Sequence, residues 1–211
     1  IQVVVIPGSP ADVTIEDGNG QTATVNTAVT TPPSVLVTDA AGNPVPGASV
    51  RFRVAGGGGK VDDGTGPADS VDVLTNPSGI AAVPGWTLGT TAGTNTLRAL
   101  LVGADSVDFT AAGTPDDAAS LELSGLPASV TAGEADSVVV TARDAFGNVA
   151  VGYTGTVEFS SSDPAAILPS DYTFTAADSG SAAFSVELRT AGARSVTVED
   201  GANSLIDTEN T

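Results

Sequence analysis

The chain has 211 residues, of which 25 are acidic and only seven are basic, so its formal net charge is −18. Nucleic acids and anionic membrane surfaces both attract clustered Lys and Arg, so we expect neither as a partner. The chain contains no Cys and no His, which excludes Ser-His-Asp and Cys-His catalytic pairs and ordinary zinc sites. A carboxylate pair for glycoside hydrolysis stays open among the 25 acidic residues, but no spacing singles one out and no aromatic platform accompanies it. We therefore expect no enzyme activity and no catalytic residue.

Short apolar runs alternate with turn residues along the whole chain. Gly (25 residues) and Pro (13 residues) crowd the gaps, together with Ser, Thr, Asp and Asn. This punctuation is typical of an all-β protein. No apolar run reaches transmembrane length, so we expect no membrane insertion. Because the chain has no initiating Met and no signal peptide, we interpret it as a processed or excised piece of a longer protein.

The chain begins with an apolar strand, residues 1–6, which Pro7 and Gly8 end. Strand patterns follow at residues 11–16, 34–38, 49–54, 71–74, 80–88, 97–102 and 106–110. The glycines at residues 56–59 lack the Lys-Ser/Thr and the helix of a phosphate-binding loop, so they predict a flexible loop that leads into an acidic stretch. We interpret Trp86, the only Trp, as a core or edge residue rather than a platform for a sugar ring.

One turn motif occurs twice and defines the domain organisation. It is an Asp-x-x-Gly-Asn turn between two apolar strands, formed by Asp39, Gly42 and Asn43 and again by Asp144, Gly147 and Asn148. The constant offset of 105 residues (147 − 42) is about the length of an immunoglobulin-like (Ig-like) sandwich. We therefore predict a leading donor or linker strand at residues 1–8, a first domain at 9–115 and a second at 116–211. We expect the Asp and Asn side chains to cap their own turns.

The second domain repeats the strand order of the first but ends differently. Its strand patterns lie at residues 120–123, 137–141, 156–159, 172–174, 182–188 and 195–198. In the first domain the closing stretch, residues 107–110, reads Val-Asp-Phe-Thr and alternates apolar with polar residues. The corresponding stretch, residues 206–209, reads Ile-Asp-Thr-Glu and cannot supply the same apolar face. We therefore expect the last strand of the second domain to be weak or missing.

Four motifs of the first domain resemble the bacterial Ig-like group 1 domains of the invasin and intimin type. They are Gly-Asn-Gly-Gln-Thr-Ala-Thr-Val at residues 18–25, the turn region at residues 37–47, Asn-Pro-Ser-Gly at residues 76–79, and Leu-Gly-Thr-Thr-Ala-Gly-Thr-Asn-Thr at residues 88–96. Residues 118–207 are similar to a related Ig-like repeat of large bacterial surface proteins. The resemblance implies two tandem Ig-like β-sandwich domains that serve as an extracellular rod, and it implies no catalytic residues.

The leading strand is the candidate for an interaction between copies. By analogy with residues 107–115, residues 1–7 match the last strand of a domain that precedes the first one. Ile1, Val3 and Val5 are then the residues for strand donation, and they would complete the second domain of a neighbouring unit or repeat. Such a contact joins units head to tail and propagates. Two alternatives stay open: the strand pairs within its own first domain while residues 205–206 form a short last strand, or an ordinary array of domains has been cut at an unsuitable boundary.

Calcium is the one metal for which the sequence offers ligands. The candidate carboxylates lie at loop or linker positions: Asp62, Asp63, Asp116, Asp117, Glu199 and Asp200. None of them fits the twelve-residue calcium loop, and solvated turn residues are the alternative interpretation. We expect no other cofactor.

These observations favour a structural repeat unit of a bacterial extracellular filament or stalk, on the cell surface or in a secreted fibre. Its expected partners are copies of itself, joined head to tail. The alternative is an adhesin or carbohydrate-binding Ig-like module that recognises a glycan or a host receptor through its loops.

Overall fold

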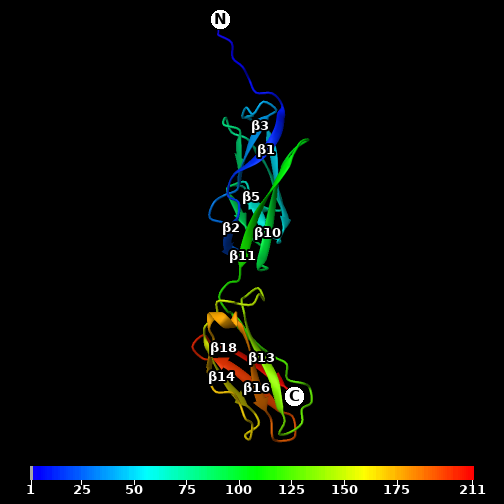
Figure 1. The fold of residues 1–211 in the computed structure, drawn as a ribbon, viewed down its shortest axis with the longest axis vertical. Coiled ribbons are helices and arrows are strands. Elements are labelled where there is room, and N and C mark those ends of the chain that lie inside the picture. The colour runs from blue at the N-terminus through cyan, green and yellow to red at the C-terminus, as the bar shows by residue number, and fades with distance from the viewer. Residues whose placement is uncertain (1) are drawn as a thin grey trace. The chain divides into compact units, whose positions relative to one another are not determined.

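The computed structural model describes residues 2–211 and divides between Thr114 and Pro115 into two compact units, each with its own core. We describe the two units separately. Both consist of β-strands, and the one helical segment in the described part of the chain is the short 3₁₀ turn Ala176–Asp178 (Figure 1). No helix within residues 2–211 has the length and apolar character that crossing a bilayer requires. The prediction of an all-β protein is confirmed.

The first unit packs a three-stranded sheet against a five-stranded one. The smaller sheet has the order β1 (Pro10–Asp17), β3 (Ser34–Asp39), β8 (Ile80–Ala82). The larger has the order β2 (Gln21–Thr24), β11 (Ser106–Thr114), β10 (Gly93–Leu101), β4 (Ser49–Gly56), β7 (Ser70–Leu74). A third small sheet contains β6 (Pro67–Ala68), β5 (Lys60–Asp62) and β9 (Gly85–Thr87). This is the two-layer arrangement of an Ig-like sandwich.

The core of the first unit forms because alternate residues of each strand point inward. On β4, Val50 and Phe52 are fully buried while Arg51 and Arg53 face solvent. Trp86 is fully buried as well, so its interpretation as a core residue is confirmed.

The glycines at residues 56–59 form a tight connection between β4 and β5, not a flexible loop, so that expectation was wrong. Gly57 and Gly58 have φ of 82° and 76°, which favours glycine. A Cβ on Gly57 would collide with Asn95, and one on Gly59 would collide with the carbonyl of Thr87. The glycines are therefore needed for close packing. The acidic stretch that follows belongs in part to the small sheet, with Asp62 at the end of β5 and Asp63 in the turn that leads to β6.

The second unit has the same two-layer arrangement with fewer strands. One sheet has the order β12 (Ser120–Ser124), β13 (Ala135–Arg143), β16 (Ser181–Glu187). The other has the order β15 (Tyr172–Thr173), β14 (Thr156–Ser161), β17 (Ser195–Asp200), β18 (Leu205–Asn210). Phe174 lies in the core with its ring 5.1 Å from that of Tyr153 and 5.5 Å from that of Tyr172.

The last strand of the second unit is present, which corrects the expectation that it is weak or missing. β18 pairs with β17 in an unbroken antiparallel register, and Leu205 is buried. Its polar residues have a task that the sequence pattern did not reveal. Asp207 accepts a hydrogen bond of 2.7 Å from the backbone N–H of Leu123, and Glu209 accepts one of 2.9 Å from that of Leu126. Carboxylates stand here in place of apolar side chains because they accept hydrogen bonds from backbone N–H groups that have no partner in a neighbouring strand.

Candidate functional site

The most regular polar feature of the two units is the carboxylate of the repeated turn. Oδ1 of Asp39 accepts hydrogen bonds of 2.9 Å from the backbone N–H groups of Ala41 and Asn43. Gly42, with φ of 83°, lets the chain reverse inside this loop. The Asp therefore caps its own turn, as we expected, and the cap holds the end of β3 against the chain that leads to β4.

The second oxygen of the same carboxylate reaches outside the turn. Oδ2 of Asp39 accepts a 2.7 Å hydrogen bond from the backbone N–H of Gly8, 31 residues earlier in the sequence. It also accepts one of 3.0 Å from Nδ2 of Asn43. One oxygen thus organises the turn, while the other holds the segment that enters the domain after Pro7.

The second unit repeats this arrangement atom by atom. Oδ1 of Asp144 accepts hydrogen bonds from the backbone N–H groups of Phe146 (2.9 Å) and Asn148 (2.8 Å). Oδ2 accepts one of 3.1 Å from the backbone N–H of Asp116 and one of 2.8 Å from Nδ2 of Asn148. Asp116 follows Pro115 just as Gly8 follows Pro7. We call these two contacts the linker clamps.

Both clamp carboxylates are buried and ionised. The hydrogen bond from the Gly8 backbone, followed by those from Asn43, lowers the pKa of Asp39 to about 2. Burial alone raises the pKa of Asp144, but the hydrogen bonds from Asn148 and from the Asp116 backbone outweigh it and leave that pKa below its ordinary value. A hydrogen bond to an ionised carboxylate is stronger than one between neutral groups. Each clamp is therefore a strong contact at neutral pH.

The leading strand lies outside both cores. Val3, Val4, Val5 and Ile6 are 78–89% exposed, and residues 2–6 form no ladder with either unit. Of the strand-donation residues, Val3 and Val5 are thus free of contacts in the core, while Ile1 lies outside the described residues. The alternative in which this segment pairs within its own domain is not what the structure adopts.

The residues of the leading strand can be aligned with those of β11. Setting Pro7 on Pro115, an offset of 108 (115 − 7), puts Ile1, Val3 and Val5 at the positions of Phe109, Ala111 and Gly113. All three β11 positions are buried. In this alignment these three apolar residues of the leading strand occupy the inward-facing positions of β11.

The first two calcium candidates use their oxygens in local turns. Oδ1 of Asp62 accepts hydrogen bonds from the N–H groups of Gly64 (2.6 Å) and Gly66 (3.1 Å). Oδ1 of Asp63 accepts hydrogen bonds from the backbone N–H (3.0 Å) and hydroxyl (2.6 Å) of Thr65, and the hydroxyl bond is the main reason for its lowered pKa. Both side chains act as turn caps.

The remaining candidates do not converge either. Asp116 and Asp117 are exposed, with Oδ1 of Asp116 accepting the N–H of Asp117 at 2.9 Å. Glu199 is exposed, whereas Asp200 is fully buried beneath Tyr153. Within residues 2–211 no three His, Cys, Asp or Glu side chains are placed to hold a metal ion together.

Two parts of this site were missed by sequence reasoning: the N–H donors Gly8 and Asp116. A signal for them was present in the sequence: Pro7 and Pro115 are separated by 108 residues, which is close to the 105 residues that separate the two turns. The sequence could not reveal that Oδ2 of each turn carboxylate accepts a hydrogen bond from the residue after the proline.

Neither a protein-family model nor a curated protein matches the sequence. Among solved structures, the chain is similar to the Escherichia coli adhesin FdeC, with 22% identity over 97% of this chain and 65% of that one and a TM-score of 0.50. It is also similar to the D0-D1 domain of intimin (15% identity, 96% of this chain and 97% of that one, TM-score 0.37). A third match is β-glucuronidase 3 of Bacteroides uniformis (16% identity, 96% of this chain, 24% of that one, TM-score 0.37).

This chain therefore spans about two-thirds of the FdeC chain that it matches. At 22% identity the likeness concerns the fold. The chain has the fold of tandem Ig-like domains, similar to those of the bacterial adhesin FdeC.

Proposed function

We propose that this chain is a pair of Ig-like modules of a bacterial cell-surface adhesin, and that the two modules act as a spacer. The observation that carries the proposal is the linker clamp, which occurs with the same atoms in both units. In each unit the clamp fixes the segment that leads into the domain, because the turn carboxylate accepts a hydrogen bond from the N–H of the residue after the proline. This contact acts on the linker and not only on the interior of the domain. The fold shared with FdeC supports the adhesin context.

The clamp shortens the part of the linker that is free to rotate. Pro115 has a fixed φ, and the residue after it has its N–H bound to Asp144. The backbone is thus constrained on both sides of the Pro115–Asp116 peptide bond. A spacer needs such restriction, because freely jointed modules would not hold a binding site away from a surface.

A selective variant exists for testing the clamp. In Asp144→Asn the remaining oxygen still caps the turn through Phe146 and Asn148. The new amide group faces two donors, the N–H of Asp116 and Nδ2 of Asn148, so the linker contact is lost together with the side-chain bond from Asn148. The matched control is Asp39→Asn, which removes the same bond at Gly8, outside the junction between the two units. Asp39→Asn also loses the corresponding bond from Nδ2 of Asn43, so the comparison with it isolates the linker contact.

Distance distributions between the units give the readout. The chain has no Cys, so one label can be placed at Ser78→Cys and another at Ala183→Cys, both exposed positions in different units. Single-molecule energy transfer should show one narrow distribution in the parent and a broader one in Asp144→Asn. Asp39→Asn should match the parent. Equal widths in all three chains would refute the spacer role of the clamp.

A second candidate function is the head-to-tail joining of units by strand donation, and the exposure of residues 3–6 favours it. Burying Ile1, Val3 and Val5 in a sandwich would contribute roughly 5–9 kcal/mol, at about 1.5–3 kcal/mol per side chain. In the second unit, β18 already fills the last-strand position. A donated strand would therefore replace β18, or add beside it as β2 adds in parallel to β11 in the first unit.

Light scattering distinguishes this candidate from a preceding module in the same polypeptide. If residues 1–6 join separate chains, the full chain forms head-to-tail multimers and a chain lacking these residues stays monomeric. If both are monomers, strand donation between separate chains is excluded.

A further inference from the structure

The outer face of the five-stranded sheet in the first unit brings three arginines together. Strand register places Arg98 of β10 directly across from Arg53 of β4, and Leu100 directly across from Arg51. Cross-strand neighbours lie about 4.5–5.5 Å apart at their Cβ atoms. Three of the seven basic residues of a strongly acidic chain therefore share one small area.

Two of these arginines are neutralised by the flanking strands. Arg98 makes two hydrogen bonds to Asp108 of β11 (2.7 and 2.8 Å), and Arg51 makes two to Asp72 of β7 (both 2.8 Å). Arg53 lies across from Ser70, which has no charge to offer.

Arg53 is the exception among the basic residues of the described chain. Five of the seven pair with a carboxylate: Arg51, Lys60, Arg98, Arg143 and Arg189. Arg194 donates to the backbone carbonyls of Thr190 and Ala191. Within residues 2–211, Arg53 alone has neither kind of partner. Like charges directly across a sheet destabilise it, so packing gives no reason for an arginine at this position.

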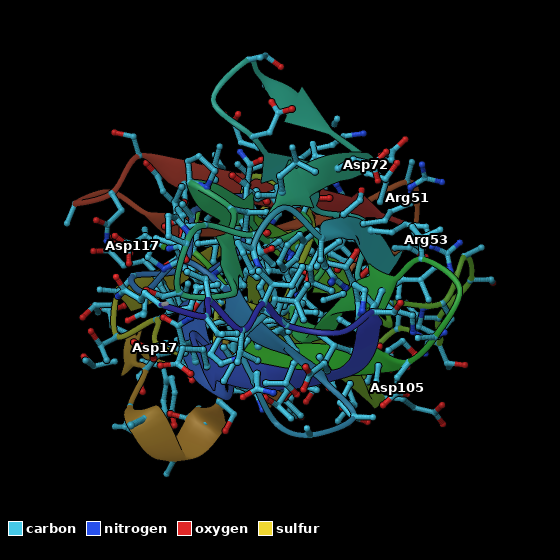
Figure 2. The ribbon with its side chains drawn as sticks, turned by 90° about the horizontal axis from the view of Figure 1, so that it is seen from above. Asp17, Arg51, Arg53, Asp72, Asp105 and Asp117 are labelled. Atoms are coloured by element: carbon cyan, nitrogen blue, oxygen red, sulfur yellow. The ribbon has the colours of Figure 1, made fainter. Side chains whose placement is uncertain are left out.

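The three guanidinium groups border a shallow hollow. It has a volume of about 350 Å³ and is lined by Arg51, Arg53, Arg98, Leu100 and Ser106. Figure 2 shows Arg51 and Arg53 projecting on the same side, with Asp72 beside them. The hollow has the size of a small ligand site, and it combines charged, hydroxyl and aliphatic groups.

We propose that this hollow binds the carboxylate of an acidic sugar residue within an otherwise neutral glycan. A free guanidinium presents a planar fork that matches a carboxylate with two parallel hydrogen bonds. The ion pairs of Arg51 and Arg98 leave Arg53 as the one arginine of this group without a paired carboxylate, and a single ligand carboxylate would supply that partner. Ser106 can bond a sugar hydroxyl, and Leu100 offers an apolar surface to the ring.

The acids at the rim set the specificity. Asp72 and Asp108 flank the hollow, and Asp105 precedes Ser106. A polyanion, such as a sulfated glycan or an acidic peptide, would place further negative charges against these carboxylates. The choice of a sugar over another carboxylate rests on the proposal that the chain is part of a cell-surface adhesin, whereas the site itself rests on the geometry around Arg53.

Nuclear magnetic resonance of the arginine Nε–H groups tests the proposal in the full chain. Methyl glucuronide should shift the Arg53 and Arg98 signals saturably, in the millimolar range of a single sugar. Methyl glucoside, which lacks the carboxylate, should produce no such shift. Arg53→Gln should weaken binding by about tenfold or more, because it removes the charged donor. Lys60→Gln is the control, since it removes one positive charge from the same unit at a residue that does not line the hollow.

Each other outcome overturns the proposal. If N-acetylglutamate amide binds as tightly as the glucuronide, the site recognises protein carboxylates and not a sugar. If the glucoside binds equally well, charge plays no part. If no signal saturates, the hollow is not a site. None of these results changes the label distances that test the linker clamp, so the two proposals can fail separately.

Discussion

The hydroxyl of Tyr153 donates a 2.6 Å hydrogen bond to Oδ2 of Asp200, and both side chains are buried. Burial, and then the Asp200 contact, raises the pKa of Tyr153, so its hydroxyl keeps the proton. Burial raises the pKa of Asp200 too, but the hydrogen bonds from Tyr153 and Asn203 outweigh it and keep this carboxylate ionised. Asp200 is therefore an anchor of the second unit, and a calcium ion would have to displace the bonds from Tyr153 and Asn203 to reach it.

Replacing Tyr153 by Phe should destabilise the second unit by about 1–3 kcal/mol, because Asp200 remains buried with one donor fewer. Urea unfolding followed by circular dichroism measures this loss. Tyr172→Phe is the matched control: it removes a 2.9 Å bond to Asp178, which lies at the less buried 3₁₀ turn. If both variants lower the free energy of unfolding by the same amount, burial does not make the Tyr153–Asp200 hydrogen bond more stabilising than the less buried one.

Trp86 makes it possible to follow one unit alone. It is the only Trp and is buried in the core of the first unit. Because the two units have separate cores, Trp fluorescence should report the unfolding of the first unit only. Tyr153→Phe should then shift the circular dichroism transition and leave the fluorescence midpoint in place. A parallel shift of both signals would mean that the units unfold together.

Much of the fold could be predicted because it depends on local patterns. The 105-residue repeat of the Asp-x-x-Gly-Asn turn indicated two sandwiches, and the alternation on residues such as Val50 and Phe52 indicated the core strands. The polar face of β18 misled the prediction, because Asp207 and Glu209 satisfy backbone groups rather than fill a core. A hydrophobic pattern contains no information about such tertiary hydrogen bonds.

The arginine pair could not be predicted for a related reason. The register between β4 and β10 shifts between Thr96, which lies across from Gly56, and Leu97, which lies across from Val54. This bulge determines that Arg98 lies across from Arg53. A shift of one residue changes every neighbour on the face, and the sequence does not specify where the bulge lies.

The Asp39 clamp should lose its effect in acid. Its pKa falls from an ordinary value of 3.8 to about 2 in the folded chain. A lowered pKa contributes stability that is complete above the unfolded value and disappears as the pH falls through the folded one. Asp39→Asn should thus be less stable than the parent at pH 7, and the difference should vanish as the pH falls from about 4 to about 2. Trp86 fluorescence in urea measures it, and a constant difference across that range would contradict the assigned pKa.

Calcium should not stabilise the chain. The carboxylates of Asp62 and Asp63 already accept hydrogen bonds in their own turns, and Asp200 accepts them from Tyr153 and Asn203. An ion would have to displace these contacts. We therefore expect the same melting temperature in chelator and in millimolar calcium, by calorimetry. A rise with calcium would restore the six carboxylates as candidates.

The position of Arg53 should cost the fold a little stability. Arg53→Gln removes a like charge that lies directly across from Arg98 and breaks no bond of the described chain. We expect the first unit to gain up to about 0.5 kcal/mol or to stay unchanged in urea unfolding. Arg98→Gln makes the same chemical change but breaks the pair with Asp108, so it should not stabilise. If Arg53→Gln instead destabilises the unit by more than Arg98→Gln, the arginine is structural, and the argument that a ligand accounts for it loses its basis.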